Sequence, residues 1–143
     1  MPPIPTGIRA LAALFLLGAC LSALACIALL LPGGVLEPIW KLNPESHEIL
    51  VSLGHAGIWL MAAASVACVF SAYGLRSFSD WGHALALSVL AINLVVDVGM
   101  AIFRHDIRAM IAVPIGGLFI AYLLQPPIIA LFKWRPLPPG HTG

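Results

Sequence analysis

One acidic residue, Asp97, lies inside a long apolar stretch of the chain. A charged carboxylate near the middle of a membrane helix costs about 2.5 to 3.5 kcal/mol on insertion scales, so it needs a functional or a structural reason to be there. Such a group can change its charge when a proton or a cation binds, because burial in low dielectric disfavours the charged form. Asp97 is therefore the strongest candidate for a functional side chain.

Other polar residues recur at helical spacing on two neighbouring stretches. On a helical wheel at about 100° per residue, the set around Asp97 falls within an arc of about 80°. It consists of His83, Asn93, Asp97, Arg104 and Arg108. A second set, in the preceding apolar stretch, falls within about 60°. It consists of Glu48, Ser52, His55 and Trp59. We expect two polar stripes on adjacent helices.

The two stripes are expected to meet at one depth in the membrane. His55 follows Glu48 by seven residues, and Asp97 precedes Arg104 by seven. In antiparallel neighbours the start of one helix shares a membrane face with the end of the other, so both residues should lie about 10 Å below the same surface. The sequence therefore predicts a polar pocket around His55, Asn93 and Asp97, with Glu48, Ser52 and Arg104 as further ligand-binding candidates.

Each of these side chains also has a purely structural interpretation. Asp97 could pair two helices or extend toward the membrane surface, and His55 could simply hydrogen-bond to a neighbouring helix. Asn93, one turn from Asp97, fits an interhelical hydrogen bond better than a ligand. Arg104 is most simply part of a solvated turn, although it could instead reach back to neutralise Asp97.

No known catalytic or cofactor-binding set accompanies these residues. A bis-histidine haem site would need a second histidine at the depth of His55, and His83 belongs at the opposite membrane face. The cysteines and histidines lack the spacing of a zinc site. A hydrolase triad could be drawn from Ser52, His55 and Asp97, but no nucleophile elbow accompanies it. We expect no metal, no cofactor and no enzyme activity.

The elements that must position these residues are four long apolar helices. The chain of 143 residues is 61% hydrophobic and 9% charged, and each of four runs is at or above the ~20 residues needed to cross a bilayer. The predicted fold is all-α, an integral membrane four-helix antiparallel bundle that forms a single four-span domain. Its spans are expected at about residues 9–31, 47–74, 82–103 and 107–132.

Prolines and glycines mark the predicted helix ends. Asn43-Pro44-Glu45 is typical of a helix start, with a capping residue, a proline at the first helical position and an acid in the first turn. The connection that includes this motif, residues 32–46, should lie on the membrane surface as a short amphipathic cap. Gln125-Pro126-Pro127 should kink or end the last helix, because two prolines remove two backbone donors.

The distribution of charge weakly favours one orientation in the membrane, and the low net charge excludes nucleic acid as a partner. A net charge of +1 leaves no basic footprint for nucleic acid. With both chain ends in the cytoplasm, four basic residues would lie inside and three outside, which favours a multi-pass protein of the bacterial inner membrane with N-in and C-in topology. The expected partners are the lipid bilayer and either a second copy of the chain or a membrane-complex subunit.

These observations predict a small integral membrane protein that binds or passes a small polar ligand, a proton or a cation at the His55/Asn93/Asp97 site. Two alternatives stay open. In the first, the protein is a non-catalytic accessory or structural subunit, and the same polar residues only hold helices together. In the second, it is an intramembrane enzyme.

Overall fold

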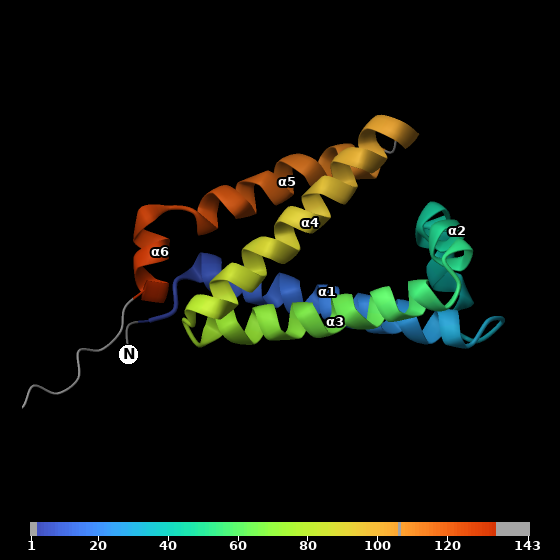
Figure 1. Ribbon diagram of the computed structural model, residues 1–143, viewed down its shortest axis with the longest axis horizontal. Coiled ribbons are helices and arrows are strands. Elements are labelled where there is room, and N and C mark those ends of the chain that lie inside the picture. The colour runs from blue at the N-terminus through green and yellow to red at the C-terminus, as the bar shows by residue number, and fades with distance from the viewer. Residues whose placement is uncertain (1–2, 106, 134–143) are drawn as a thin grey trace, which may run out of the picture. The chain divides into compact units, whose positions relative to one another are not determined.

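The computed structural model describes residues 3–105 and 107–133, and these residues form helices without any strand. In chain order the helices are α1 (Thr6–Leu30), the 3-10 helix η1 (Glu37–Leu42), α2 (Pro44–Ser52), α3 (His55–Arg76), α4 (Asp80–Arg104), α5 (Ile107–Leu123) and α6 (Pro126–Lys133) (Figure 1). The chain divides into two compact units, Met1–Arg76 and Ser77–Gly143. The first contains α1 to α3, and the second contains α4 to α6.

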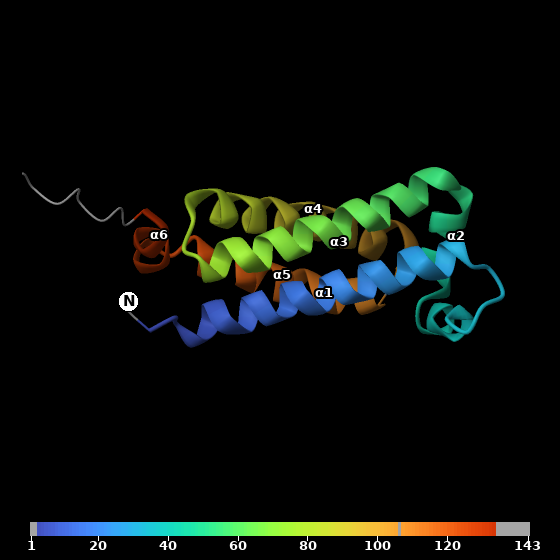
Figure 2. The ribbon, with the colours of Figure 1, turned by 90° about the horizontal axis from the view of Figure 1, so that it is seen from below.

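The first unit is built on an antiparallel hairpin of α1 and α3, which lie side by side (Figure 2). Small residues allow a close approach: the Cys68 Sγ lies 3.7 Å from the position that a Cβ on Gly18 would take. The Ser65 hydroxyl donates a 2.9 Å hydrogen bond to the Ala19 carbonyl on the facing helix. Small residues and polar side chains that bond across helices are typical of packing in membranes, where burial of apolar surface does not drive helices together.

A cap formed by η1 and α2 packs against one end of this hairpin. Asn43 starts α2 as predicted, because its Oδ1 accepts a 3.2 Å hydrogen bond from the Ser46 N–H. The indole of Trp40 stacks on the His47 ring at a centroid distance of 4.6 Å. Trp40 is buried in a cluster with Ala28 of α1 and Leu50 of α2. The cap is thus held by an apolar core of its own.

The predicted second span, residues 47–74, is wrong at its start, because the chain breaks between α2 and α3. Gly54 has a φ of +55°, in the left-handed region that glycine adopts at little cost. At this turn the start of α3 comes so close to α2 that a Cβ on Gly57 would clash with the backbone carbonyl of Leu50. Within this region α3 alone, 22 residues from His55 to Arg76, is long and apolar enough to cross a membrane.

The second unit is a hairpin of α4 and α5, which are also antiparallel. The Leu94 Cδ1 lies 3.5 Å from the position that a Cβ on Gly116 would take, and His83 near the start of α4 bonds to Leu123 at the end of α5. The connection is short, since α4 ends at Arg104 and α5 begins at Ile107. His105 makes this turn with a φ of 53°.

The predicted kink at Gln125-Pro126-Pro127 is confirmed. α5 ends at Leu123, α6 begins at Pro126, and the two axes bend by 57° (Figure 1). α6 then packs against both α4 and α5. Pro114 lies inside α5 without ending it.

Three helices, α1, α3 and α4, are long and apolar enough to cross a membrane. The bent pair α5–α6 supplies a fourth candidate if it counts as one span. The all-helical architecture with three or four such helices agrees with the predicted integral membrane protein. Closure of all four into one antiparallel bundle stays a prediction.

Candidate functional site

Asp97 lies on the face of α4 that packs against α5. Residues at spacings of three and four along this face are buried or half-buried; they are His83, Leu87, Leu90, Leu94, Asp97 and Ala101. Leu94 and His83, both of which contact α5, lie within about 60° of Asp97 around the helix. Asp97 is half-buried and engages in a hydrogen-bonding or electrostatic interaction. It is therefore part of the packed seam of the hairpin.

The position of Asp97 along α4 places it well inside the apolar region. It precedes Arg104, the last residue of α4, by seven residues, which corresponds to about 10 Å along the axis. An aspartate side chain is far shorter than that distance. The contact between Leu94 and Gly116 sets the antiparallel register, which brings Asp97 level with about Val113 of α5.

The other two candidates on α4 do not join this seam. Asn93 is exposed, although it lies one turn before Asp97. Arg104 is exposed at the end of α4. The alternative in which Arg104 neutralises Asp97 stays a prediction.

The candidates in the first unit do not form the predicted stripe. Glu48 and Ser52 belong to α2, whereas His55 is the first residue of α3. All three are exposed, and the Ser52 hydroxyl donates to the Ile49 carbonyl of its own helix at 2.7 Å. The predicted stripe requires one continuous helix, and the turn at Gly54 changes the direction of the chain between Ser52 and His55. His55 consequently lies at a helix end rather than about two turns inside one.

The pocket predicted from both stripes would need residues of both units. His55 belongs to the first unit, and Asn93 and Asp97 belong to the second. Their approach stays a prediction. Between residues 3 and 133, leaving out 106, no group of three or more His, Cys, Asp or Glu side chains could hold a metal ion.

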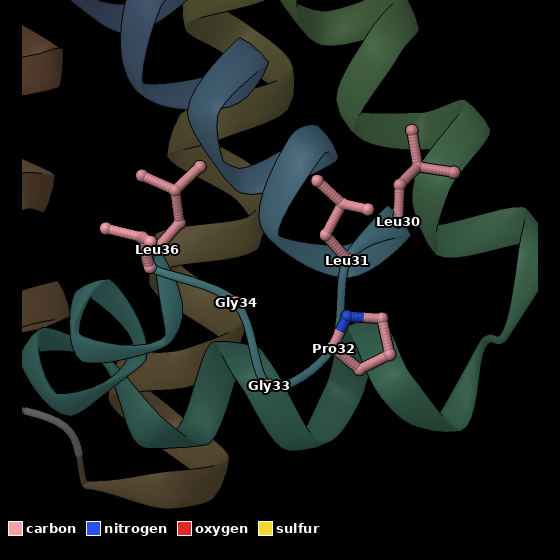
Figure 3. A pocket seen from close by; sticks show the side chains of 7 residues that line it. Leu30, Leu31, Pro32, Gly33, Gly34 and Leu36 are labelled. Carbon is pink, nitrogen blue, oxygen red and sulfur yellow. The ribbon is translucent and has the colours of Figure 1, made fainter.

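A hollow in the first unit has none of these candidates in its lining. It is formed by the loop after α1 and is lined by Leu30, Leu31, Pro32, Gly33, Gly34, Val35 and Leu36 (Figure 3). Its lining carries no titratable side chain, and it opens broadly to the surroundings. We assign no binding role to it.

His83 makes defined contacts in the second unit that its sequence pattern did not predict. The His83 Nε2 lies 2.9 Å from the Leu123 carbonyl oxygen, and its ring packs against Phe132. The signal was present in the sequence, because Pro127, four residues after Leu123, cannot supply the N–H that this carbonyl would accept within a helix. His83 was instead grouped with the polar stripe.

Comparison with known proteins found no matching family model, no matching curated protein and no matching solved structure. The interpretation of the site therefore depends on its chemistry. That chemistry centres on one ionisable group, Asp97, in the seam between two apolar helices.

Proposed function

We propose that this chain is a small multi-span membrane protein that binds a proton, a cation or another small polar ligand at Asp97. The observation that carries the proposal is the half-buried position of Asp97 on the packed face of α4, about 10 Å from the helix end. Ionisable residues inside membrane segments usually face a protein interior and mark ion or substrate pathways. The half-buried position of Asp97 fits the first part of that description and supports the proposal of the second.

The chemistry of α4 favours a small cationic ligand. A carboxylate in low dielectric gains stability when its charge is neutralised by a proton or a metal cation. Asn93 lies four residues before Asp97, a spacing at which two side chains on a helix are neighbours. Its amide oxygen is a ligand of the kind that hard cations accept beside a carboxylate. In this proposal Asp97 carries the charge, and Asn93 is an auxiliary ligand.

His55 remains a proposed third member of the site. Its exposed position at the first turn of α3 leaves the imidazole accessible for bonding. The proposal for Asp97 does not depend on it, since a His55 variant and an Asp97 variant can be compared directly.

A second candidate function is that of an accessory subunit in a membrane complex. Asp97 occupies a seam position that recurs every seven residues with His83 and Leu90. A single polar residue at such a position can fix the register and pairing of helices at a cost in stability. In that case Asp97 would specify the α4–α5 hairpin, and the activity would belong to a partner.

Carbodiimide labelling tests the first proposal, because dicyclohexylcarbodiimide modifies protonated carboxyl groups in apolar surroundings. In the full chain reconstituted in liposomes, we expect Asp97 to react several-fold faster than Asp80, an exposed acid on the first turn of the same helix. Raising the pH, or adding the cation that binds, should slow the reaction at Asp97. Peptide mass spectrometry gives both rates from one sample.

The Asp97→Asn variant separates the two candidate functions, because it keeps the shape and removes the charge. In the ligand-binding role it should unfold at nearly the same temperature as the wild type and show no cation-dependent change. In the structural role it should lower the thermal midpoint of the second unit. Labelling of wild-type Asp97 that neither pH nor sodium, potassium or calcium alters would contradict the binding proposal.

A further inference from the structure

Two prolines leave two backbone carbonyls at the end of α5 without their usual helical donors. The carbonyls of Tyr122 and Leu123 would accept from residues 126 and 127, and both of those are proline. The Gln125 N–H donates to the Tyr122 carbonyl at 3.2 Å, which satisfies the first. The Leu123 carbonyl needs a donor from another element.

His83 of α4 supplies that donor. Its Nε2 lies 2.9 Å from the Leu123 oxygen in a partly buried contact. A carbonyl oxygen can only accept, so the ring must carry its proton on Nε2 in this arrangement. A buried carbonyl without a hydrogen bond lowers the free energy of unfolding, especially where no water can replace the missing donor. The bond from His83 therefore stabilises the point at which the chain turns from α5 into α6.

The same ring also contacts α6 directly. The centroids of the His83 and Phe132 rings are 4.7 Å apart, and Phe132 in turn packs against Phe78 at 5.8 Å. Phe132 is 3% exposed and Ile128 7% exposed, so these two side chains form the buried face of α6. With eight residues α6 is too short to be a stable helix by itself. Its structure depends on these contacts.

We propose that His83 is a latch that holds α6 folded against the start of α4, and that loss of its hydrogen bond to Leu123 releases α6 as a unit. The latch is independent of any ligand at Asp97 and goes beyond the function proposed above. It joins three segments at one point: the start of α4, the end of α5 and the buried face of α6. Release would change the position of the C-terminal helix while leaving the α4–α5 seam in place.

Hydrogen exchange of the full chain in lipid nanodiscs tests the latch. The reporters are the amides of Ile128 and Ile129, which donate to the Gln125 carbonyl at 2.9 and 3.0 Å at the start of α6. His83→Phe keeps an aromatic ring against Phe132 but removes the donor, and we expect α6 to exchange about ten-fold faster, the size expected for one unmade buried hydrogen bond. His83→Gln, which can still donate, should recover part of the protection.

Ser88→Ala is the matched control on the same helix. The Ser88 hydroxyl is exposed and donates only to the Ala84 carbonyl of α4, at 2.8 Å. Its removal should leave exchange in α6 unchanged. Peptides from α1 and α3 report whether any variant has lost its fold as a whole.

A double-mutant cycle tests whether the faster exchange of α6 depends on the Leu123 carbonyl. Pro127→Ala restores the N–H that Leu123 would accept within a helix, so His83→Phe should have little effect on α6 in that background. Equal effects of His83→Phe with and without Pro127→Ala would overturn the latch, as would wild-type exchange of α6 in His83→Phe. If His83→Phe alone proved unfolded, rescue of its fold by Pro127→Ala would support the proposal, and failure of that rescue would contradict it.

Discussion

Side chains that bond to carbonyls of a facing helix hold the first unit together. Ser65 donates to Ala19 at 2.9 Å, and the Cys26 thiol makes a weaker contact of 3.7 Å with the Ile58 carbonyl. Both carbonyls already accept within their own helices, so these are additional bonds rather than replacements. Their main effect is to fix the distance and register of α1 and α3.

Ser65→Ala should therefore destabilise the α1–α3 hairpin modestly. Interhelical hydrogen bonds of this kind contribute about 0.6 kcal/mol on average and up to about 1.7 kcal/mol. The free energy of unfolding, measured by steric trapping in bilayer discs, should fall within that range. Ser88→Ala, which removes a hydroxyl bonded only within its own helix, is the control. An equal decrease in the free energy of unfolding in both variants would show that the interhelical bond contributes no more to stability than a bond within one helix.

At the level of single residues, counting along the chain holds only within one continuous helix. Asp97 and His83, two members of the predicted stripe on α4, are half-buried, whereas Asn93 and Arg104 are exposed. His55 was placed by counting from Glu48 through Gly54, and that count failed because the helix ends at Ser52. A glycine inside an apolar run is tolerated in many helices, so the sequence alone could not indicate the break.

The corner between α2 and α3 is tightly packed at Gly57. Any side chain at Gly57 would press on the backbone of Leu50, which cannot move like the end of a flexible side chain. Leu50 also belongs to the buried cluster with Trp40. The corner and the cap core therefore depend on each other.

Gly57→Ala should push α2 away from α3 and loosen the cap. We expect a loss of about 1 to 3 kcal/mol, the usual cost of overpacking, together with a red shift of tryptophan emission as Trp40 becomes more exposed. Gly117→Ala is the matched control, since a Cβ there would meet nothing within 4 Å. It should be neutral or slightly stabilising, because alanine is the better helix former. A Gly57→Ala protein as stable as this control would refute the close approach.

The helices were predicted to within a few residues where prolines, glycines or capping residues mark their ends. The expected spans at 9–31 and 82–103 correspond to α1 (Thr6–Leu30) and α4 (Asp80–Arg104). The proline pair was correctly predicted to interrupt the last helix, because its effect is a local loss of donors. The fold-back of α2 depends instead on contacts with α3 that are made only in three dimensions, and no local signal encodes them.

For the whole molecule, the number of crossings depends on the last two helices. α5 contains 17 residues, at the short end of what can span a bilayer. If α5 crosses alone, with α6 at the membrane boundary, the chain has four spans and both ends lie on one side. If α5 and α6 instead form a re-entrant loop, it has three spans and the ends lie on opposite sides. The apolar composition of both helices permits either arrangement.

Four variants, each with one added cysteine, distinguish these topologies with a membrane-impermeant maleimide. The sites are Thr6, Val35, Arg104 and Lys133, all exposed and all at or beyond helix ends. The four-span protein should be labelled at Thr6 and Lys133 from one side and at Val35 and Arg104 from the other. Labelling of Lys133 together with Arg104 would show three spans. The parent chain, whose cysteines at 20, 26 and 68 lie within helices, measures background labelling. The weak charge bias, four basic residues inside against three outside, further predicts that Thr6 and Lys133 lie on the cytoplasmic side. Labelling of both from outside would reverse the orientation and leave the four spans intact.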